Sequence, residues 1–126
     1  MNVRRGQIYA SVTMPGSVGS EQMGERPVLI ISNNVGNRHA PIVNVAPLTT
    51  RKSKSKQPMH VHLGSYENNL PFDSIALLEQ IATIDKSRIK GTLLTCLDES
   101  KMAEVDAAIS VCLGLTAAKS HKEAFQ

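Results

Sequence analysis

Short apolar runs alternate with polar, turn-forming segments along most of the chain. Six runs have the length and the β-branched composition of strands: residues 7–12, 27–32, 42–48, 59–63, 74–79 and, more weakly, 88–94. The segments between them are rich in Gly, Pro, Asn and Ser, which interrupt regular structure. This spacing predicts a small β-barrel or β-sandwich.

The apolar pattern differs from strand to strand. The runs VLII at 28–31 and IALL at 75–78 are continuous, which indicates strands covered on both faces. MHVHL at 59–63 alternates, so we expect His60 and His62 on one face and the apolar side chains on the other.

A C-terminal helix is predicted over residues 98–114 as part of the cover. Met102, Val105 and Ile109 recur there at helical spacing. Asp98 suits the N-cap and Gly114 the C-terminal stop. Residues 116–126 show no apolar stripe, so we expect one domain over residues 1–115 followed by a flexible tail.

Composition limits the class of protein. No apolar run approaches the roughly 20 residues that cross a membrane, and the N-terminal segment has no signal-peptide pattern, so we expect a soluble, cytoplasmic protein. The two cysteines, Cys96 and Cys112, stand in no metal-binding motif, and we expect them to be reduced and buried.

Charge is distributed unevenly. Residues 1–97 hold eleven Lys and Arg against six Asp and Glu, whereas residues 98–126 hold three against five. A basic body suits a polyanionic ligand. Four cations fall within six residues at 51–56, RKSKSK, either as a solvated hairpin connection or as a contact for phosphate.

Metal chemistry has little support in the sequence. His60 and His62 would need a third ligand for a catalytic zinc site, and His39 and His121 stand in a turn and in the tail. No two-metal carboxylate set, phosphate loop or GxSxG motif is present. We therefore expect no metal and no cofactor.

Arg26 stands where a polar, glycine-containing segment meets an apolar strand. It precedes Pro27, which restricts it to extended geometry and so fixes the direction of its side chain. An ion pair with Glu21 or Glu25 would explain this arginine as well as a role in binding an anion would.

Several motifs occur in an order and spacing that resemble the MazF/PemK family of toxin endoribonucleases, over about residues 3–115. They are RRGQIYASV, GSEQMGERPVLIISNNVGN, VAPLTT, PMHVHL, DSIALLEQIATIDKSRI and DESKMAEVDAAISVCLGL. The resemblance implies a mainly β fold, a small SH3-like barrel with a C-terminal helix, that acts as a homodimer. It also implies sequence-specific, metal-independent cleavage of single-stranded RNA to 2′,3′-cyclic phosphate and 5′-hydroxyl ends, which inhibits translation and growth. A MazE-like cognate antitoxin would be the protein partner.

The resemblance assigns catalysis to Arg26 and Thr49. It implies a set of RNA-binding residues: Ser20, Glu21, Gln22, Thr50, Arg51, Ser74 and Gln80. Glu21 is also the candidate general base.

Two departures from the family pattern flank this site. Met23 stands where a glycine is common, and Pro47 where a small residue is common, so the cleaved motif is expected to differ from that of relatives. Two other functions fit the same fold: a toxin that binds a protein target such as DNA gyrase, and an RNA-binding module without catalysis.

Overall fold

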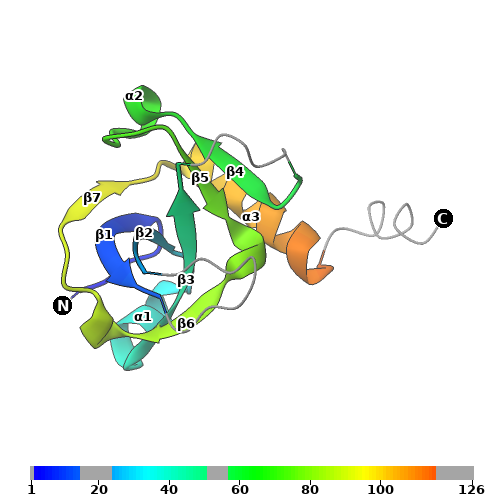
Figure 1. Ribbon diagram of the computed structural model, residues 1–126. Helices are drawn as coiled ribbons and strands as arrows, with labels where there is room; N and C mark the ends of the chain where they lie inside the picture. The colour runs from blue at the N-terminus through cyan, green and yellow to red at the C-terminus, as the bar shows by residue number, and fades with distance from the viewer. Residues whose placement is uncertain (1, 15–23, 51–56, 116–126) are drawn as a thin grey trace.

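The computed structural model describes residues 2–14, 24–50 and 57–115 of the chain (Figure 1). The strands within these ranges are β1 (Gln7–Thr13), β2 (Glu25–Ile30), β3 (Ile42–Thr49), β4 (His60–Leu63), β5 (Ser74–Leu77), β6 (Ala82–Asp85) and β7 (Leu93–Cys96). The helices are α1 (Asn34–His39), α2 (Ser65–Asn68) and α3 (Glu99–Leu113), with 3-10 turns η1 (Leu78–Gln80) and η2 (Lys86–Arg88).

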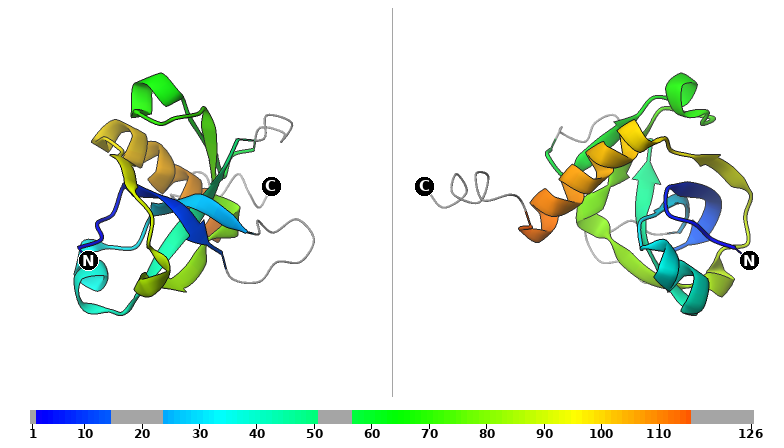
Figure 2. Two further views of the ribbon diagram at one scale, coloured as in Figure 1. Left: turned by 60° about the vertical axis from the view of Figure 1, so that its left-hand side comes forward. Right: turned by 180° about the vertical axis from the view of Figure 1, so that it is seen from behind.

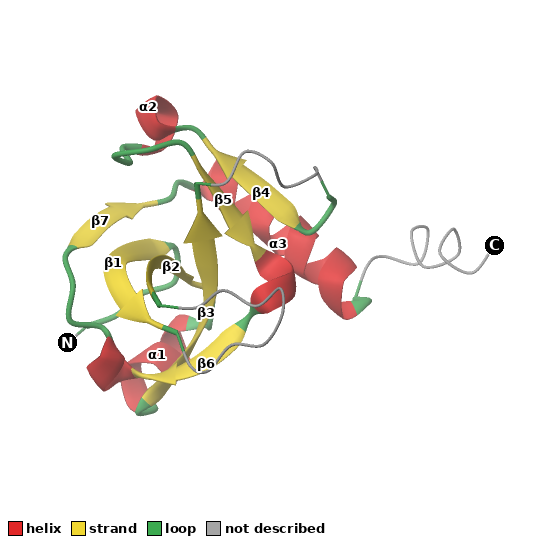
Figure 3. Ribbon diagram, viewed as in Figure 1, coloured by secondary structure: helices red, strands yellow, loops and turns green. Residues whose placement is uncertain are grey.

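The strands form one curved antiparallel sheet with β3 at its centre (Figure 3). Its order is β4-β5-β3-β2-β1-β7, and β6 pairs with β3 beside β5. One edge of β3 therefore bonds to β2, while the other bonds first to β6 and then to β5. The turn η1 carries the chain from β5 to β6 along that edge.

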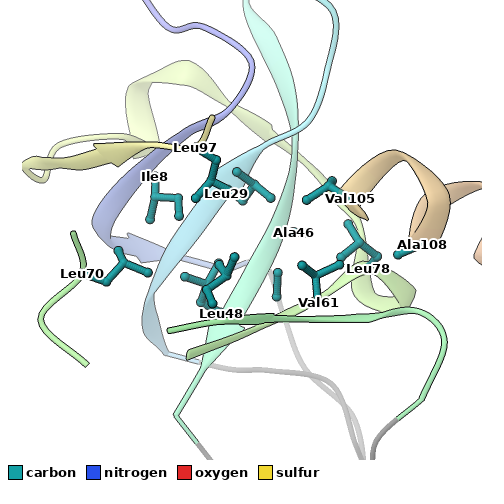
Figure 4. Packing of buried hydrophobic residues seen from close by; sticks show 12 residues of the cluster. Ile8, Leu29, Ala46, Leu48, Val61, Leu70, Leu78, Leu97, Val105 and Ala108 are labelled. Atoms are coloured by element: carbon teal, nitrogen blue, oxygen red, sulfur yellow. The ribbon is translucent and has the colours of Figure 1, made fainter. Parts of the chain in front are cut away.

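Both faces of the central strands are buried. In β2, Leu29 packs into a cluster with residues of β3, β4, β5 and α3, whereas Val28 and Ile30 pack into a second cluster with residues of β1, β3 and β6. Figure 4 shows the first cluster enclosed between the sheet and α3. This arrangement confirms that the continuous apolar run VLII is covered on both faces.

The helix α3 lies diagonally across the sheet (Figure 2, right). The side chain of Asp98 caps it by accepting a hydrogen bond from the Lys101 amide, and Gly114 ends it in the left-handed conformation at φ 72°. Val105 and Ala108 are buried against the first cluster. The predicted helix and both of its ends are confirmed.

The expected mainly β barrel with a C-terminal helix is confirmed, with corrections to individual elements. The strand predicted over 88–94 is wrong: η2 ends at Arg88 and β7 begins at Leu93. The strand predicted over 74–79 ends at Leu77, and β2 begins two residues before the predicted position. The sequence did not predict α1, α2 or β6, because these elements are short and carry no clear apolar period.

Both cysteines are free, but the prediction that they are buried is wrong. Cys96 is exposed at the end of β7, and Cys112 is half-buried on α3. Cys96 lies on a strand that pairs along only one edge, with β1, in the described part of the chain, which explains its exposure.

The backbone of β1 passes close to Gly91. A Cβ added there would lie 2.0 Å from the carbonyl oxygen of Ala10, so the two backbone segments would have to move apart. We expect Gly91→Ala to lower the free energy of unfolding by about 1–3 kcal/mol, measured by urea denaturation. Gly36→Ala is the control, because the atom nearest its Cβ would be 3.5 Å away; equal losses in both variants would contradict the close approach.

Candidate active site

Arg26 and Thr49 lie on neighbouring strands. The β2–β3 ladder ends at the pair of Val28 with Pro47, and Arg26 and Thr49 lie two residues beyond that pair on their strands. Side chains two residues apart on a strand point to the same face, so Arg26 shares the face of Val28 and Thr49 that of Pro47. Arg26 is half-buried and Thr49 is buried, so both side chains lie where the sheet leaves its core.

The same face continues over two further strands. Thr49 pairs with Ile75 of β5, and Ile75 pairs with His62 of β4. These pairings align side chains from four strands in what we call the active-site row: Arg26, Thr49, Ile75 and His62. Because adjacent strands are about 4.8 Å apart, His62 lies roughly 10 Å from Thr49 along the row.

A hydrogen-bonded pair, with His60 buried, stands beside this row. His60 points to the same face as His62, and its Nε2 lies 2.9 Å from Oε2 of Glu79 in η1. Within the described part of the chain, His60 Nδ1 and Glu79 Oε1 are buried without a hydrogen-bond partner. The pair connects η1 to β4 and thereby holds Gln80, the last residue of η1, at this edge of the sheet.

The other predicted RNA-binding residues separate into two groups. Thr50 is exposed after the end of β3, and Ser74 and Gln80 are half-buried at the start of β5 and the end of η1. Four predicted positions lie outside the described residues: Ser20, Glu21, Gln22 and Arg51. The same holds for Met23 and for the three lysines of the basic run.

A cavity of about 480 Å³ opens at the end of the active-site row, between β4, α2 and β5. Its wall includes His62 and Ile75 from the row. Polar groups complete it: Thr50, Glu67, Asp73 and Ser74. Two of the predicted RNA-binding residues, Thr50 and Ser74, thus share one cavity.

The sequence matches a family model over residues 4–113. The family is described as the PemK-like, MazF-like toxins of type II toxin–antitoxin systems. The chain belongs to this family. Two relatives named Endoribonuclease MazF, from Staphylococcus saprophyticus and Staphylococcus epidermidis, are each 48% identical over 120 residues, which is 95% of this chain and 98% of each relative.

Solved structures of this MazF type share the fold. A mycobacterial endoribonuclease in complex with its cognate antitoxin superposes with a TM-score of 0.71 at 29% identity, covering 91% of this chain and 98% of that one. MazF from Deinococcus radiodurans superposes with a TM-score of 0.74 at 22% identity, over 90% and 98% of the two chains, which supports the fold alone.

In this MazF-type site, the described residues can stabilise an anion. The guanidinium of Arg26 offers a planar set of donors that fits two phosphate oxygens, and the Thr49 hydroxyl can donate another hydrogen bond. Among the described residues, no group of three or more His, Cys, Asp and Glu side chains could hold a metal ion.

Sequence reasoning missed two features of this MazF-type site. It placed His60 only on the face of its strand opposite the apolar side chains, and it placed Glu79 at the end of a strand rather than in η1. The only signal was distant: a His on an alternating strand and a Glu that ends an apolar run, 19 residues apart. It missed the cavity because Glu67 comes from α2, which was not predicted.

The two histidines of β4 allow a matched test of the His60–Glu79 pair. We expect His60→Ala to lower the free energy of unfolding by about 1–3 kcal/mol, because it leaves the Glu79 carboxylate without its partner. His62→Ala, at an exposed position on the same face, should change it by less than about 0.5 kcal/mol. Urea denaturation measures both; equal effects would contradict a structural role for the pair.

Proposed function

We propose that the chain is the toxin component of a type II toxin–antitoxin system and acts as an endoribonuclease that cleaves single-stranded RNA without a metal ion. The observation that carries the proposal is the β2–β3 register, which, with the alternation of side chains along each strand, turns Arg26 and Thr49 to one face of the sheet. The names of the 48%-identical relatives support the same activity. Cleavage of mRNA at short motifs would inhibit translation and growth.

The reaction begins when the ribose 2′-oxygen attacks the adjacent phosphorus, and the bond to the 5′-oxygen breaks. The products are a 2′,3′-cyclic phosphate and a 5′-hydroxyl. Negative charge grows on the non-bridging oxygens in the transition state, and donors already in place stabilise it without reorganising. Arg26 binds those oxygens in pairs, and Thr49 donates to one of them.

Proton transfer needs a group other than Arg26, because a guanidinium does not deprotonate at ordinary pH. A base must take the proton of the 2′-hydroxyl, and an acid must protonate the leaving 5′-oxygen. Glu21 is our candidate for the base. Glu21 belongs to the segment before β2, so in this proposal the base comes from that segment and the donors, Arg26 and Thr49, come from the sheet.

Sequence selection involves residues around this pair. Gln80 can form two hydrogen bonds with one base edge, and the His60–Glu79 pair holds the turn that carries it. Ser20, Gln22, Thr50, Arg51 and Ser74 complete the proposed RNA surface. Met23 and Pro47 are where we expect the cleaved motif to diverge from that of relatives.

The proposed partners are single-stranded RNA, a cognate MazE-like antitoxin and a second copy of this chain, in the cytoplasm. A related mycobacterial endoribonuclease has been solved in complex with its cognate antitoxin, which supports the antitoxin. No helix among the described residues is long and apolar enough to cross a membrane.

Of the alternatives, a toxin that binds a protein target such as DNA gyrase has less support. The relatives that cover nearly the whole chain are named as endoribonucleases. An RNA-binding module without catalysis would not need a guanidinium and a hydroxyl placed on one face of neighbouring strands.

RNA cleavage tests the proposal directly. In excess chelator, the chain should cut single-stranded RNA and leave 5′-hydroxyl ends, which 5′-end sequencing after phosphorylation detects. Arg26→Ala should lower the cleavage rate by about 10²–10³-fold, because it removes donors to the developing charge. Arg38→Ala is the control. It removes the same charge from α1, which precedes the end of β3 opposite Thr49, and it should cleave at the parent rate. Intact RNA with the parent chain would contradict the proposal.

The dimer has its own test. Large apolar side chains at the end of α3 are exposed, including Val111, Leu113 and Leu115, and a second copy would cover them. Light scattering at micromolar concentration should give twice the 13.6 kDa chain mass. Leu113→Glu should shift the mass toward the monomer while circular dichroism stays unchanged. A monomeric parent chain would contradict the dimer.

A further inference from the structure

The cavity at the end of the active-site row has no part in the chemistry described above. Its volume of about 480 Å³ lies within the usual range of small-molecule pockets, roughly 300–1,000 Å³. His62 and Ile75 belong both to the row and to the cavity wall, and Thr50 follows Thr49 directly in the chain. An RNA chain with a phosphodiester at Arg26 and Thr49 therefore brings a flanking nucleotide to this cavity.

Hydrogen-bond acceptors dominate the polar wall. The exposed Glu67 has no hydrogen bond or ion pair within the described part of the chain, and its carboxylate lies directly against the backbone of Gly64. The Ser74 hydroxyl donates to the carbonyl of Phe72 at 3.0 Å, so its lone pairs face outward as acceptors. One carboxylate oxygen of Asp73 accepts a hydrogen bond from the Ser65 amide at 2.8 Å, which anchors α2 beside the cavity.

This wall suits a base better than a phosphate. The carboxylates of Glu67 and Asp73 repel a phosphodiester, but they attract the N–H and amino groups of a nucleobase edge. A carboxylate that accepts from the amino group of cytosine is a known mode of base recognition. An exocyclic amino group offers these acceptors two N–H donors, whereas uracil offers only its single N3–H. The acceptors therefore favour bases with an amino group over uracil.

Two exposed aromatic residues are sequence neighbours of lining residues of this cavity. Phe72 directly precedes the lining residue Asp73, and Tyr66 directly precedes Glu67. Their side chains are largely exposed, at 67% and 94%, whereas the third aromatic residue of the described ranges, Tyr9, is buried. Exposed rings are stacking surfaces for bases, and these two are the exposed rings of the described ranges.

We propose that this cavity is a nucleobase subsite, in which Glu67 accepts hydrogen bonds from the amino group of a nucleotide flanking the cleaved bond and Phe72 stacks on its base. The inference rests on the proposed endoribonuclease function and adds a specificity determinant to it. The subsite discriminates against uracil at one position of the motif, while Arg26 and Thr49 act on the phosphodiester beside it.

The test is cleavage of a random-sequence RNA pool in excess chelator, followed by sequencing of the 5′-hydroxyl ends. The parent chain should disfavour uracil by about tenfold at one flanking position, the scale of a good side-chain-to-base contact. Glu67→Gln keeps the side-chain shape but replaces one acceptor oxygen by an amide NH₂ donor. It should reduce this discrimination to about twofold or less. Other positions of the motif should not change.

Glu99→Gln is the matched control. It removes the same charge at an exposed position of α3 outside the cavity wall, and it should keep the parent preference. Phe72→Ala is the second variant, and it should raise the KM for a preferred oligonucleotide by about tenfold while kcat stays within about twofold. Circular dichroism of each variant checks the fold.

The outcomes separate the two proposals. If the parent chain leaves RNA intact, the endoribonuclease function fails and the subsite fails with it. If the parent chain cuts and Glu67→Gln shows an unchanged motif, only the subsite is overturned. If Glu67→Gln loses affinity for the antitoxin but keeps the parent motif, the subsite is also overturned, because the cavity would then serve a basic side chain of the antitoxin.

Discussion

The strand β3 is the element on which the rest of the structure depends, because its backbone hydrogen bonds join every part of the site. One edge bonds to β2 and the other to β6 and β5 in succession. Pairing a strand by one residue out of register turns its side chains to the opposite face. The two buried clusters on the two faces of β2 and β3 exclude such a shift, since it would carry apolar side chains from one core into the other. The hydrophobic core thus holds Arg26 and Thr49 on one face.

Burial decreases along β2 toward the site in a way that suits a charged side chain. Val28, Leu29 and Ile30 are fully buried, whereas Pro27 and Arg26 are half-buried and Glu25 is exposed. A guanidinium deeper in the core would lose hydration that no single partner restores. At the end of the strand it keeps water nearby while its backbone is held by β1, through the pairing of Arg26 with Val12. The position combines a rigid backbone with a solvated charge.

Much of this architecture could be predicted from the sequence, for physical reasons. A continuous apolar run such as VLII predicts a strand buried on both faces. Asp98 and Gly114 predict helix ends, because a side-chain N-cap and a left-handed glycine satisfy the free backbone groups there. Arg26 and Thr49 came from a family resemblance, and the register then places them together. The His60–Glu79 pair and the cavity could not be predicted. Both depend on contacts between segments far apart in the chain, and neither η1 nor α2 has a local pattern that separates it from a loop.

The active-site row has a consequence for how such a toxin can diverge. Its spacing comes from hydrogen bonds between main chains, which almost any side chain allows, so mutations elsewhere leave the distance between Arg26 and Thr49 unchanged. The surfaces around the row come from α2, η1 and the ends of strands, where several side chains are exposed. The periphery can therefore change from one relative to another while the strands that carry Arg26 and Thr49 keep their spacing.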